Sequence, residues 1–181
     1  MKLKNNLSLA LLLLLLVLVS LGLTFWEKGS SGPQVDPELF AIENIDPIDR
    51  VVITHQGQVI DGRAFSGGFL INDKFAMDGN LLTLLAAVLQ QVRVQRPLGG
   101  QQQERLWQNI QENGSHVEVY AGEQLLSSFW ASGDEAKEQS YFATEDGKVY
   151  LVNLPGYTSY VSGLFELPLS DWRSRVVFSN T

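Results

Sequence analysis

The stretch Asn80–Val92, NLLTLLAAVLQQV, carries the clearest structural signal in the sequence. Its large apolar residues recur at the spacing of one helix face: Leu81, Leu82, Leu84, Leu85, Val88, Leu89 and Val92. Asp78, just before the stretch, belongs to the residue types that cap helix N-termini. Because a large apolar side chain contributes about 1.5–3 kcal/mol when it is fully buried, we expect this helix to lie at the centre of the core.

Short strands are predicted on both sides of this helix, because runs rich in β-branched residues alternate with glycine-containing turns. The strands before it form a meander, and the predicted strands are 50–55, 59–65, 69–74, 93–96, 116–121, 124–131, 139–144, 148–152 and 176–178. A second helix, 101–113, is mostly polar and is expected on the surface, and a short helical stretch is expected at 157–165. The sequence therefore predicts an α+β fold, with mainly antiparallel sheet or sheets packed on one amphipathic helix plus a second surface helix.

The N-terminal residues predict a membrane anchor. Leu7–Trp26 is a run of uncharged residues, and a helix of this length crosses about 30 Å of hydrocarbon. Lys2 and Lys4 precede the run, so the positive-inside rule leaves the N-terminus in the cytoplasm and carries the rest across the membrane. A cleaved signal peptide is the alternative, with Ser20 and Gly22 as small residues before a cut. We therefore expect one N-terminal transmembrane helix to precede the folded domain.

The anchor divides the chain into four parts. Residues 1–6 are expected in the cytoplasm, residues 7–26 in the bilayer, residues 27–38 in a Gly/Ser/Pro-rich linker, and residues 39–181 in a single α+β domain. The predicted location is the bacterial inner membrane, which the chain crosses once. The C-terminal domain is then periplasmic or extracytoplasmic.

Composition narrows the possible classes of function. The chain carries a formal net charge of −7, and Lys2 and Lys4 are the only charged side chains before residue 27, so the remainder carries −9. This balance opposes nucleic acid and anionic lipid surfaces as partners of the domain, since both reward clustered Lys and Arg. The sequence contains no cysteine, which excludes disulfides, thiolate catalysis and thiolate metal sites.

A set of short motifs occurs along the domain in one order: Ile48–Ile53, Gly68–Asn72, Leu81–Leu89, Val94–Pro97, Tyr141, Val149–Val152 and Asp171–Arg173. In this order the chain, from about Phe40 to Phe178, resembles the bacterial domain-of-unknown-function family 4340. Phe69 stands where members of that family usually have tryptophan. The resemblance implies an accessory role in the cell envelope, because many members are encoded beside ABC-transporter components of the gliding-motility type. No catalytic residues are established for the family, so the resemblance assigns none here.

Residue types that carry catalysis or bind metals do not fall into a recognised pattern. The two histidines, His55 and His116, lack the spacing of a zinc motif. Ser66 lacks the first glycine of a G-x-S-x-G turn, although a triad could still assemble from distant residues. We interpret the acidic residues of 134–138 as a solvated loop. No catalytic, cofactor-binding or metal-binding residue is therefore predicted, no cofactor is expected, and the chain is not expected to be an enzyme.

Aromatic residues gather in the C-terminal half of the chain. Because Trp, Tyr and Arg often dominate the binding energy of protein interfaces, a candidate interaction surface is formed by Trp130, Tyr157, Tyr160, Trp172 and Arg173. The alternative is that most of these aromatics are core residues of a β-rich fold.

These observations favour a membrane-anchored, non-catalytic envelope domain that acts as an accessory or interaction subunit of a membrane complex. The resemblance suggests an ABC transporter system as that complex. The expected partners are the lipid bilayer, through Leu7–Trp26, and another membrane protein, but no nucleic acid. A tethered ligand- or glycan-binding module is the alternative function, and an envelope hydrolase is the third hypothesis.

Overall fold

The structure is a computed structural model that describes residues 12–13, 15–17, 35–156 and 160–174. It consists of two compact units, Met1–Gln34 and Val35–Thr181. The described residues of the first unit are helical, and their side chains are exposed. Among the described residues, no helix is both long and apolar enough to cross a membrane, and most of Leu7–Trp26 lies outside them.

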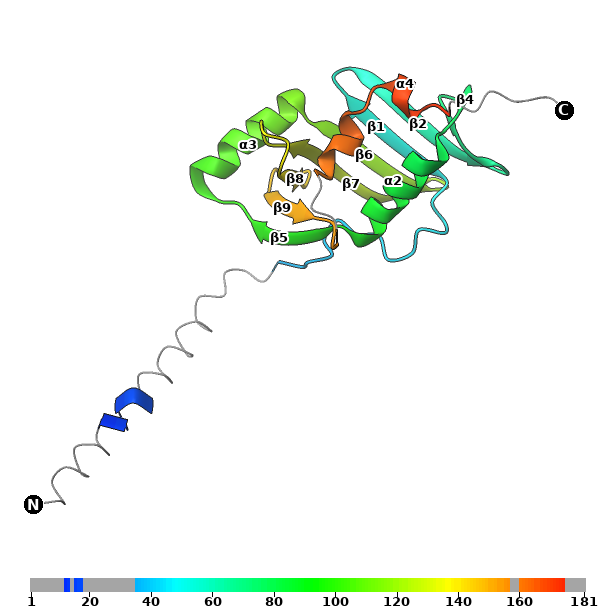
Figure 1. The fold of residues 1–181 in the computed structure, drawn as a ribbon. Coiled ribbons are helices and arrows are strands. Elements are labelled where there is room, and N and C mark those ends of the chain that lie inside the picture. The colour runs from blue at the N-terminus through cyan, green and yellow to red at the C-terminus, as the bar shows by residue number, and fades with distance from the viewer. Residues whose placement is uncertain (1–11, 14, 18–34, 157–159, 175–181) are drawn as a thin grey trace, which may run out of the picture. The chain divides into compact units, whose positions relative to one another are not determined.

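The described strands of the second unit form one antiparallel sheet (Figure 1). The strands are β1 (Arg50–His55), β2 (Gln58–Phe65), β3 (Gly68–Ile71), β4 (Phe75–Ala76), β5 (Arg93–Pro97), β6 (Ser115–Ala121), β7 (Gln124–Gly133), β8 (Ser140–Ala143) and β9 (Val149–Asn153). Their order across the sheet is β4-β3-β2-β1-β6-β7-β8-β9-β5, and each neighbouring pair is antiparallel. Most neighbours are hairpins, whereas β1 beside β6 and β9 beside β5 join strands that are distant in the sequence.

The first hairpin illustrates how local sequence sets the strand register. Gln56 and Gly57 connect β1 to β2 with φ values of 46° and 77°, so both lie in the left-handed region. A two-residue turn with this backbone matches the twist of paired strands, and glycine adopts it without steric cost. The turn pairs His55 with Gln58 and thereby Val52 with Asp61.

The helices of this unit are α2 (Gly79–Gln91), α3 (Gly100–Asn113), the 3-10 helix η1 (Ser162–Glu166) and the single-turn α4 (Leu169–Trp172). Asp78 is confirmed as the N-cap of α2, because its side chain accepts a hydrogen bond from the Asn80 N–H at 2.9 Å. Helix α3 ends before Gly114, whose N–H donates to the carbonyl of Ile110 at 2.8 Å. Figure 1 shows α2 and η1 on one face of the sheet.

Hydrophobic residues are buried on both faces of the sheet, because alternate residues of a strand point to opposite sides. In β8, Phe142 belongs to the main core, which also contains α2 and η1 residues, while Tyr141 and Ala143 belong to a second, smaller cluster. That second cluster includes Ile110 of α3. Helix α3 therefore covers the other face of the sheet at its β7–β9 end, where it contacts β7 and β9.

The chain covers both edges of its own sheet. At the β4 edge, the N–H of Ser174 donates to the carbonyl of Ala76 at 2.8 Å. At the β5 edge, the N–H of Val94 donates to the carbonyl of Pro37 at 2.8 Å, and Pro97 within the strand has no N–H to offer. Covered edges and proline hinder pairing with strands of other molecules.

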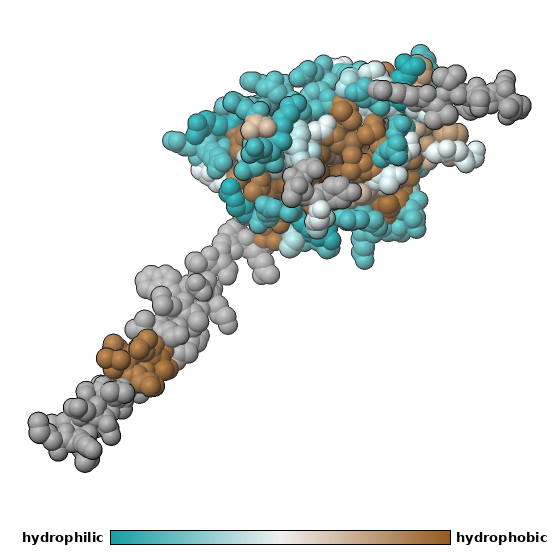
Figure 2. Space-filling view, in the orientation of Figure 1, coloured by the Kyte–Doolittle hydropathy of each residue, from teal (hydrophilic) through white to brown (hydrophobic). Residues whose placement is uncertain are grey.

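The predicted fold class, α+β with a preceding transmembrane helix, is wrong. Strand residues of one antiparallel sheet outnumber helix residues in the described chain, and no described helix could cross a membrane. The physical reason lies in the core, because α2 contributes only Leu85, Val88 and Leu89 as buried residues and most other buried residues come from strands. Its remaining leucines stay partly exposed, and Figure 2 shows apolar surface on the α2 and η1 side of the domain.

Candidate functional site

A polar and aromatic surface lies on the face of the sheet that is turned away from α2, where β1, β2, β6 and β7 lie side by side. Cross-strand pairing arranges its side chains in rows, such as Asp61–Val52–Glu118–Ser128. We call it the open face, formed by Arg50, Val52, Thr54, Val59, Asp61, Arg63, His116, Glu118, Tyr120, Ser128 and Trp130. Val59 is 47% exposed and the Arg63 side chain 50%, so solvent reaches this surface.

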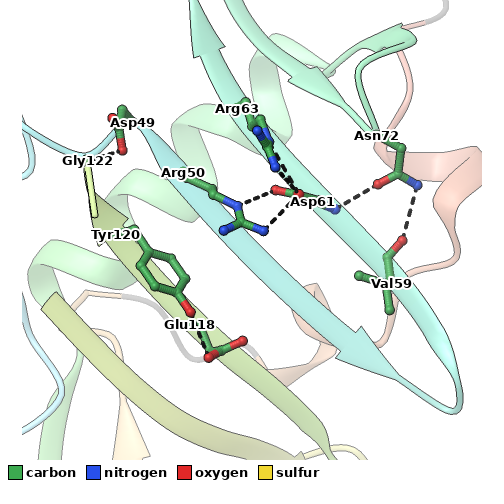
Figure 3. Close-up of polar contacts among 9 residues, drawn as sticks. All are labelled: Asp49, Arg50, Val59, Asp61, Arg63, Asn72, Glu118, Tyr120 and Gly122. Atoms are coloured by element: carbon green, nitrogen blue, oxygen red, sulfur yellow. Dashed lines mark hydrogen bonds and ion pairs between the residues drawn. The ribbon is translucent and has the colours of Figure 1, made fainter. Parts of the chain in front are cut away.

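One end of the open face is organised around Asp61 (Figure 3). The guanidinium of Arg50 donates to both carboxylate oxygens of Asp61, at 2.8 and 3.0 Å, and Arg63 donates to the same carboxylate at 3.0 Å. Arg50 also lies over the ring of Tyr120, 5.2 Å from its centroid, while the Tyr120 hydroxyl donates to Glu118 at 2.8 Å. A two-point ion pair fixes the plane of a guanidinium, so these side chains are held in position before any partner arrives.

The pKa of Asp61 is lowered, chiefly by its hydrogen bonds from Arg50 and against the opposing effect of burial, with Arg63 adding to the decrease. A carboxyl whose folded-state pKa is lowered stabilises the folded protein above its unfolded pKa, and this contribution disappears as the pH falls through the folded-state pKa. Asp61→Asn is therefore expected to lower the urea midpoint near neutral pH, with the difference from wild type shrinking as the pH falls below the ordinary aspartate pKa of about 4 and through the lowered folded-state pKa. The control is Glu104→Gln, because Glu104 is an exposed residue of α3. A difference that stayed constant with pH would contradict the role of the Asp61 ion pairs.

The other end of the open face is organised around Glu145, which extends from the turn between β8 and β9. His116 Nε2 lies 2.7 Å from Glu145 Oε1, the Ser128 hydroxyl donates to the same oxygen, and Trp130 Nε1 donates to the other oxygen at 3.3 Å. Burial alone would raise the pKa of Glu145, but the hydrogen bonds from these neighbours outweigh it and lower the pKa. Trp130 packs against His116, with ring centroids 4.7 Å apart, and edge-on against Trp107 of α3 at 6.1 Å.

Ser128, His116 and Glu145 form a Ser–His–acid cluster, but its geometry differs from that of a catalytic relay. In a relay, the acid binds Nδ1 of the histidine, and Nε2 is left free to take the proton of the serine. Here the carboxylate and the serine both lie at Nε2, 2.7 and 3.1 Å away. Because a carboxylate only accepts hydrogen bonds, Nε2 carries the proton and cannot act as the base for Ser128. The cluster orients Trp130 and His116 rather than activating a nucleophile.

A second Ser–His pair, Ser115 and His55, also lacks that geometry. The hydroxyl of Ser115 donates to the carbonyl of Phe165 at 2.9 Å, so its oxygen accepts from Nδ1 of His55 at 3.0 Å. Ser115 is fully buried. The hydroxyl proton is hydrogen-bonded to a backbone carbonyl, and because the side chain is buried, no reactant could approach its oxygen.

The structure separates the residues that the sequence suggested as one interaction surface. Trp130 is half-buried on the open face, and Tyr160 lines a cleft on another part of the domain. Trp172 is fully buried in the main core, and Arg173 lies 3.7 Å over the ring of Phe75. Tyr157 lies outside the described residues. Trp172 thus fits the alternative interpretation of the aromatics as core residues.

The sequence analysis did not predict the open face, although the sequence pattern was sufficient to indicate part of it. Arg50, Asp61 and Arg63 alternate with buried residues in predicted strands, which indicates that they share one face of a hairpin. Glu145 gave no such signal, because a turn residue has no fixed facing direction. Among the described residues, no group of three His, Cys, Asp or Glu side chains could hold a metal ion.

Comparison with known proteins found no match, neither to a family model nor to a curated protein nor to a solved structure. The resemblance to family 4340 therefore stays a prediction from the sequence.

Proposed function

We propose that this chain is a membrane-attached, non-catalytic envelope domain that acts as an interaction subunit of a membrane complex through its open face. The observation that carries the proposal is the combination of exposure and order on this surface. Arginine and aromatic side chains of adjacent strands reach solvent, and ion pairs at Asp61 and hydrogen bonds to Glu145 hold them in place.

Such an arrangement suits protein binding for two physical reasons. Arg, Tyr and Trp are the residues that most often dominate interface energy. Ordering a flexible side chain on binding costs about 0.5–1.5 kcal/mol, and much of this cost is already met where the free protein holds the side chain in place. Arg50, with a bidentate ion pair and a ring beneath it, is the clearest case.

The proposed partner is another membrane protein. The apolar run Leu7–Trp26 would hold the domain at the bilayer, which raises its local concentration beside membrane proteins. The formal charge of −9 beyond residue 26 disfavours anionic lipid headgroups and favours a partner with a basic surface. A component of an ABC transporter is the partner that the sequence resemblance suggests.

Site-specific photocrosslinking in native membranes tests this proposal. A photoreactive amino acid at Val59, which is exposed on the open face, is expected to yield a crosslinked adduct with another membrane protein. The matched control carries the same amino acid at Gln90, an exposed position of α2, which packs on the opposite face of the sheet. Arg63→Ala in the Val59 probe protein should weaken the adduct, because it removes a half-exposed arginine that lies on the same face of β2 as the probe and pairs with Asp61.

Two outcomes would overturn the proposal. One is an adduct of equal yield from the Val59 and Gln90 probes, since the contact would then not be specific to the open face. The other is a full-length protein that migrates as a lone monomer after mild solubilisation and gives no adduct from either position.

A further inference from the structure

A cleft of about 680 Å³ opens on a part of the domain that the proposed function does not use. It is lined by the C-terminal end of α3, the end of β7 and the following loop, His55 of β1, and residues around η1. A smaller depression of about 300 Å³ shares Asn109, Gly133, Asp134 and Glu135 with it. Together they make an extended recess with both polar and apolar surface.

One wall of the cleft is held by unusually close packing around Tyr160. A Cβ atom added at Gly133 would lie 1.9 Å from the Tyr160 ring, and one added at Gly163 would lie 2.5 Å from it. Glycine at both positions therefore lets the backbone approach the ring from two elements. The Tyr160 hydroxyl donates to Glu166, and burial, followed by this bond, raises the pKa of Tyr160 to about 12. The ring is consequently a neutral, fixed part of the cleft.

Other lining side chains are also oriented by neighbours. The Ser115 hydroxyl donates its hydrogen bond to the Phe165 carbonyl, so its oxygen accepts one from Nδ1 of His55. The other ring nitrogen of a neutral His55, Nε2, is then an acceptor. Asp134 accepts the backbone N–H groups of residues 138 and 139 at 2.7 and 2.9 Å, and Lys137 lies 3.4 Å from Glu166. Such preset orientations lower the cost of binding a polar ligand.

The chemistry of the lining indicates the ligand class. The cleft is lined by carboxylates, the side-chain amides of Asn109 and Asn113, a lysine and an imidazole, so donors and acceptors are both present. Three carboxylates against one lysine disfavour an anion, and a wholly apolar ligand is disfavoured because it would leave these polar side chains without partners. Sugar hydroxyls both donate and accept hydrogen bonds, and they match a mixed lining of this kind. We propose that this cleft binds a segment of a neutral saccharide.

Binding of neutral trisaccharides to the full chain tests the proposal. Maltotriose, cellotriose and tri-N-acetylchitotriose would be titrated by calorimetry and by saturation-transfer NMR, in a detergent without a sugar headgroup, so that the detergent does not compete. Saturable binding of at least one of them is expected. Asn109→Ala/Asn113→Ala should weaken it about tenfold or more, because two side chains lose hydrogen bonds to the ligand.

The control is Gln108→Ala/Gln111→Ala, a pair of exposed positions on the same helix that do not line the cleft. It should bind like the wild type, and circular dichroism would verify that both double variants fold. The proposal is overturned if none of the three trisaccharides binds at about 10 mM, a concentration at which a site with a Kd of about 1 mM would be mostly occupied, or if both double variants weaken binding equally. Binding of putrescine in place of every trisaccharide would also overturn it, because the cleft would then be an acidic site for amines. None of these outcomes bears on crosslinking through the open face.

Discussion

Replacing Trp172 with alanine is expected to lower the free energy of unfolding by about 3–5 kcal/mol, the cost of removing a large aromatic side chain from a packed core. Trp172 is fully buried, although it belongs to a helix of only four residues. Its carbonyl accepts the backbone N–H of Asp78 at 2.9 Å, and Asp78 caps α2. Loss of the side chain should therefore loosen the start of α2 as well as the core. Urea unfolding followed by circular dichroism measures the change.

Trp172→Phe distinguishes packing from hydrogen bonding at this position. Within the described part of the chain, the indole Nε1 of Trp172 is buried without a hydrogen-bond partner. An unpaired buried donor costs about 1–3 kcal/mol, so phenylalanine removes a penalty while it keeps much of the apolar contact. We expect Trp172→Phe to retain most of the stability that Trp172→Ala loses. A loss below about 1 kcal/mol for Trp172→Ala would contradict the core assignment, since surface substitutions usually stay within about ±0.5 kcal/mol.

Local patterns in the sequence predicted individual elements well. The predicted strands 50–55, 59–65 and 116–121 and the predicted helix Asn80–Val92 agree with β1, β2, β6 and α2 to within a residue or two. These elements depend on alternation, helical spacing and turn residues, all of which act over a few positions. The fold class failed because it depends on pairings such as β1 with β6 and β9 with β5, which no local pattern encodes.

In the candidate site, too, local patterns indicate some features, whereas others depend on contacts between distant parts of the chain. Alternation in the first hairpin is sufficient to place Arg50 and Asp61 on one face, but the bidentate contact between them depends on the register that Gln56 and Gly57 set. Glu145 reaches His116 only because the turn after β8 lies beside β6 and β7 in the assembled sheet. The pairing of Tyr160 with Gly133 and Gly163 is equally non-local, since a glycine in the sequence does not reveal what approaches it.

Phe40 is expected to be the second position with a large effect. It is 3% exposed, and its ring meets those of Phe129, Phe142 and Tyr150 edge-on, with centroids 5.5 to 5.8 Å away. Edge-to-face pairs contribute about 0.5–1.5 kcal/mol beyond the burial of their area. Phe40→Ala should therefore cost about 3–5 kcal/mol, measured by urea unfolding.

Leu39→Ala is the matched control, because Leu39 is the preceding residue and is 40% exposed, so its loss should cost less than about 0.5 kcal/mol.

Two truncations test the same segment without a substitution. A protein that starts at Val35 keeps Phe40 and the Pro37–Val94 hydrogen bond and should unfold at the wild-type urea midpoint. A protein that starts at Glu43 loses both and exposes the β5 edge, so it should unfold at lower urea and aggregate more readily. Equal midpoints for the two truncations would show that residues 35–42 do not stabilise the sheet, and Phe40 would then have no structural role.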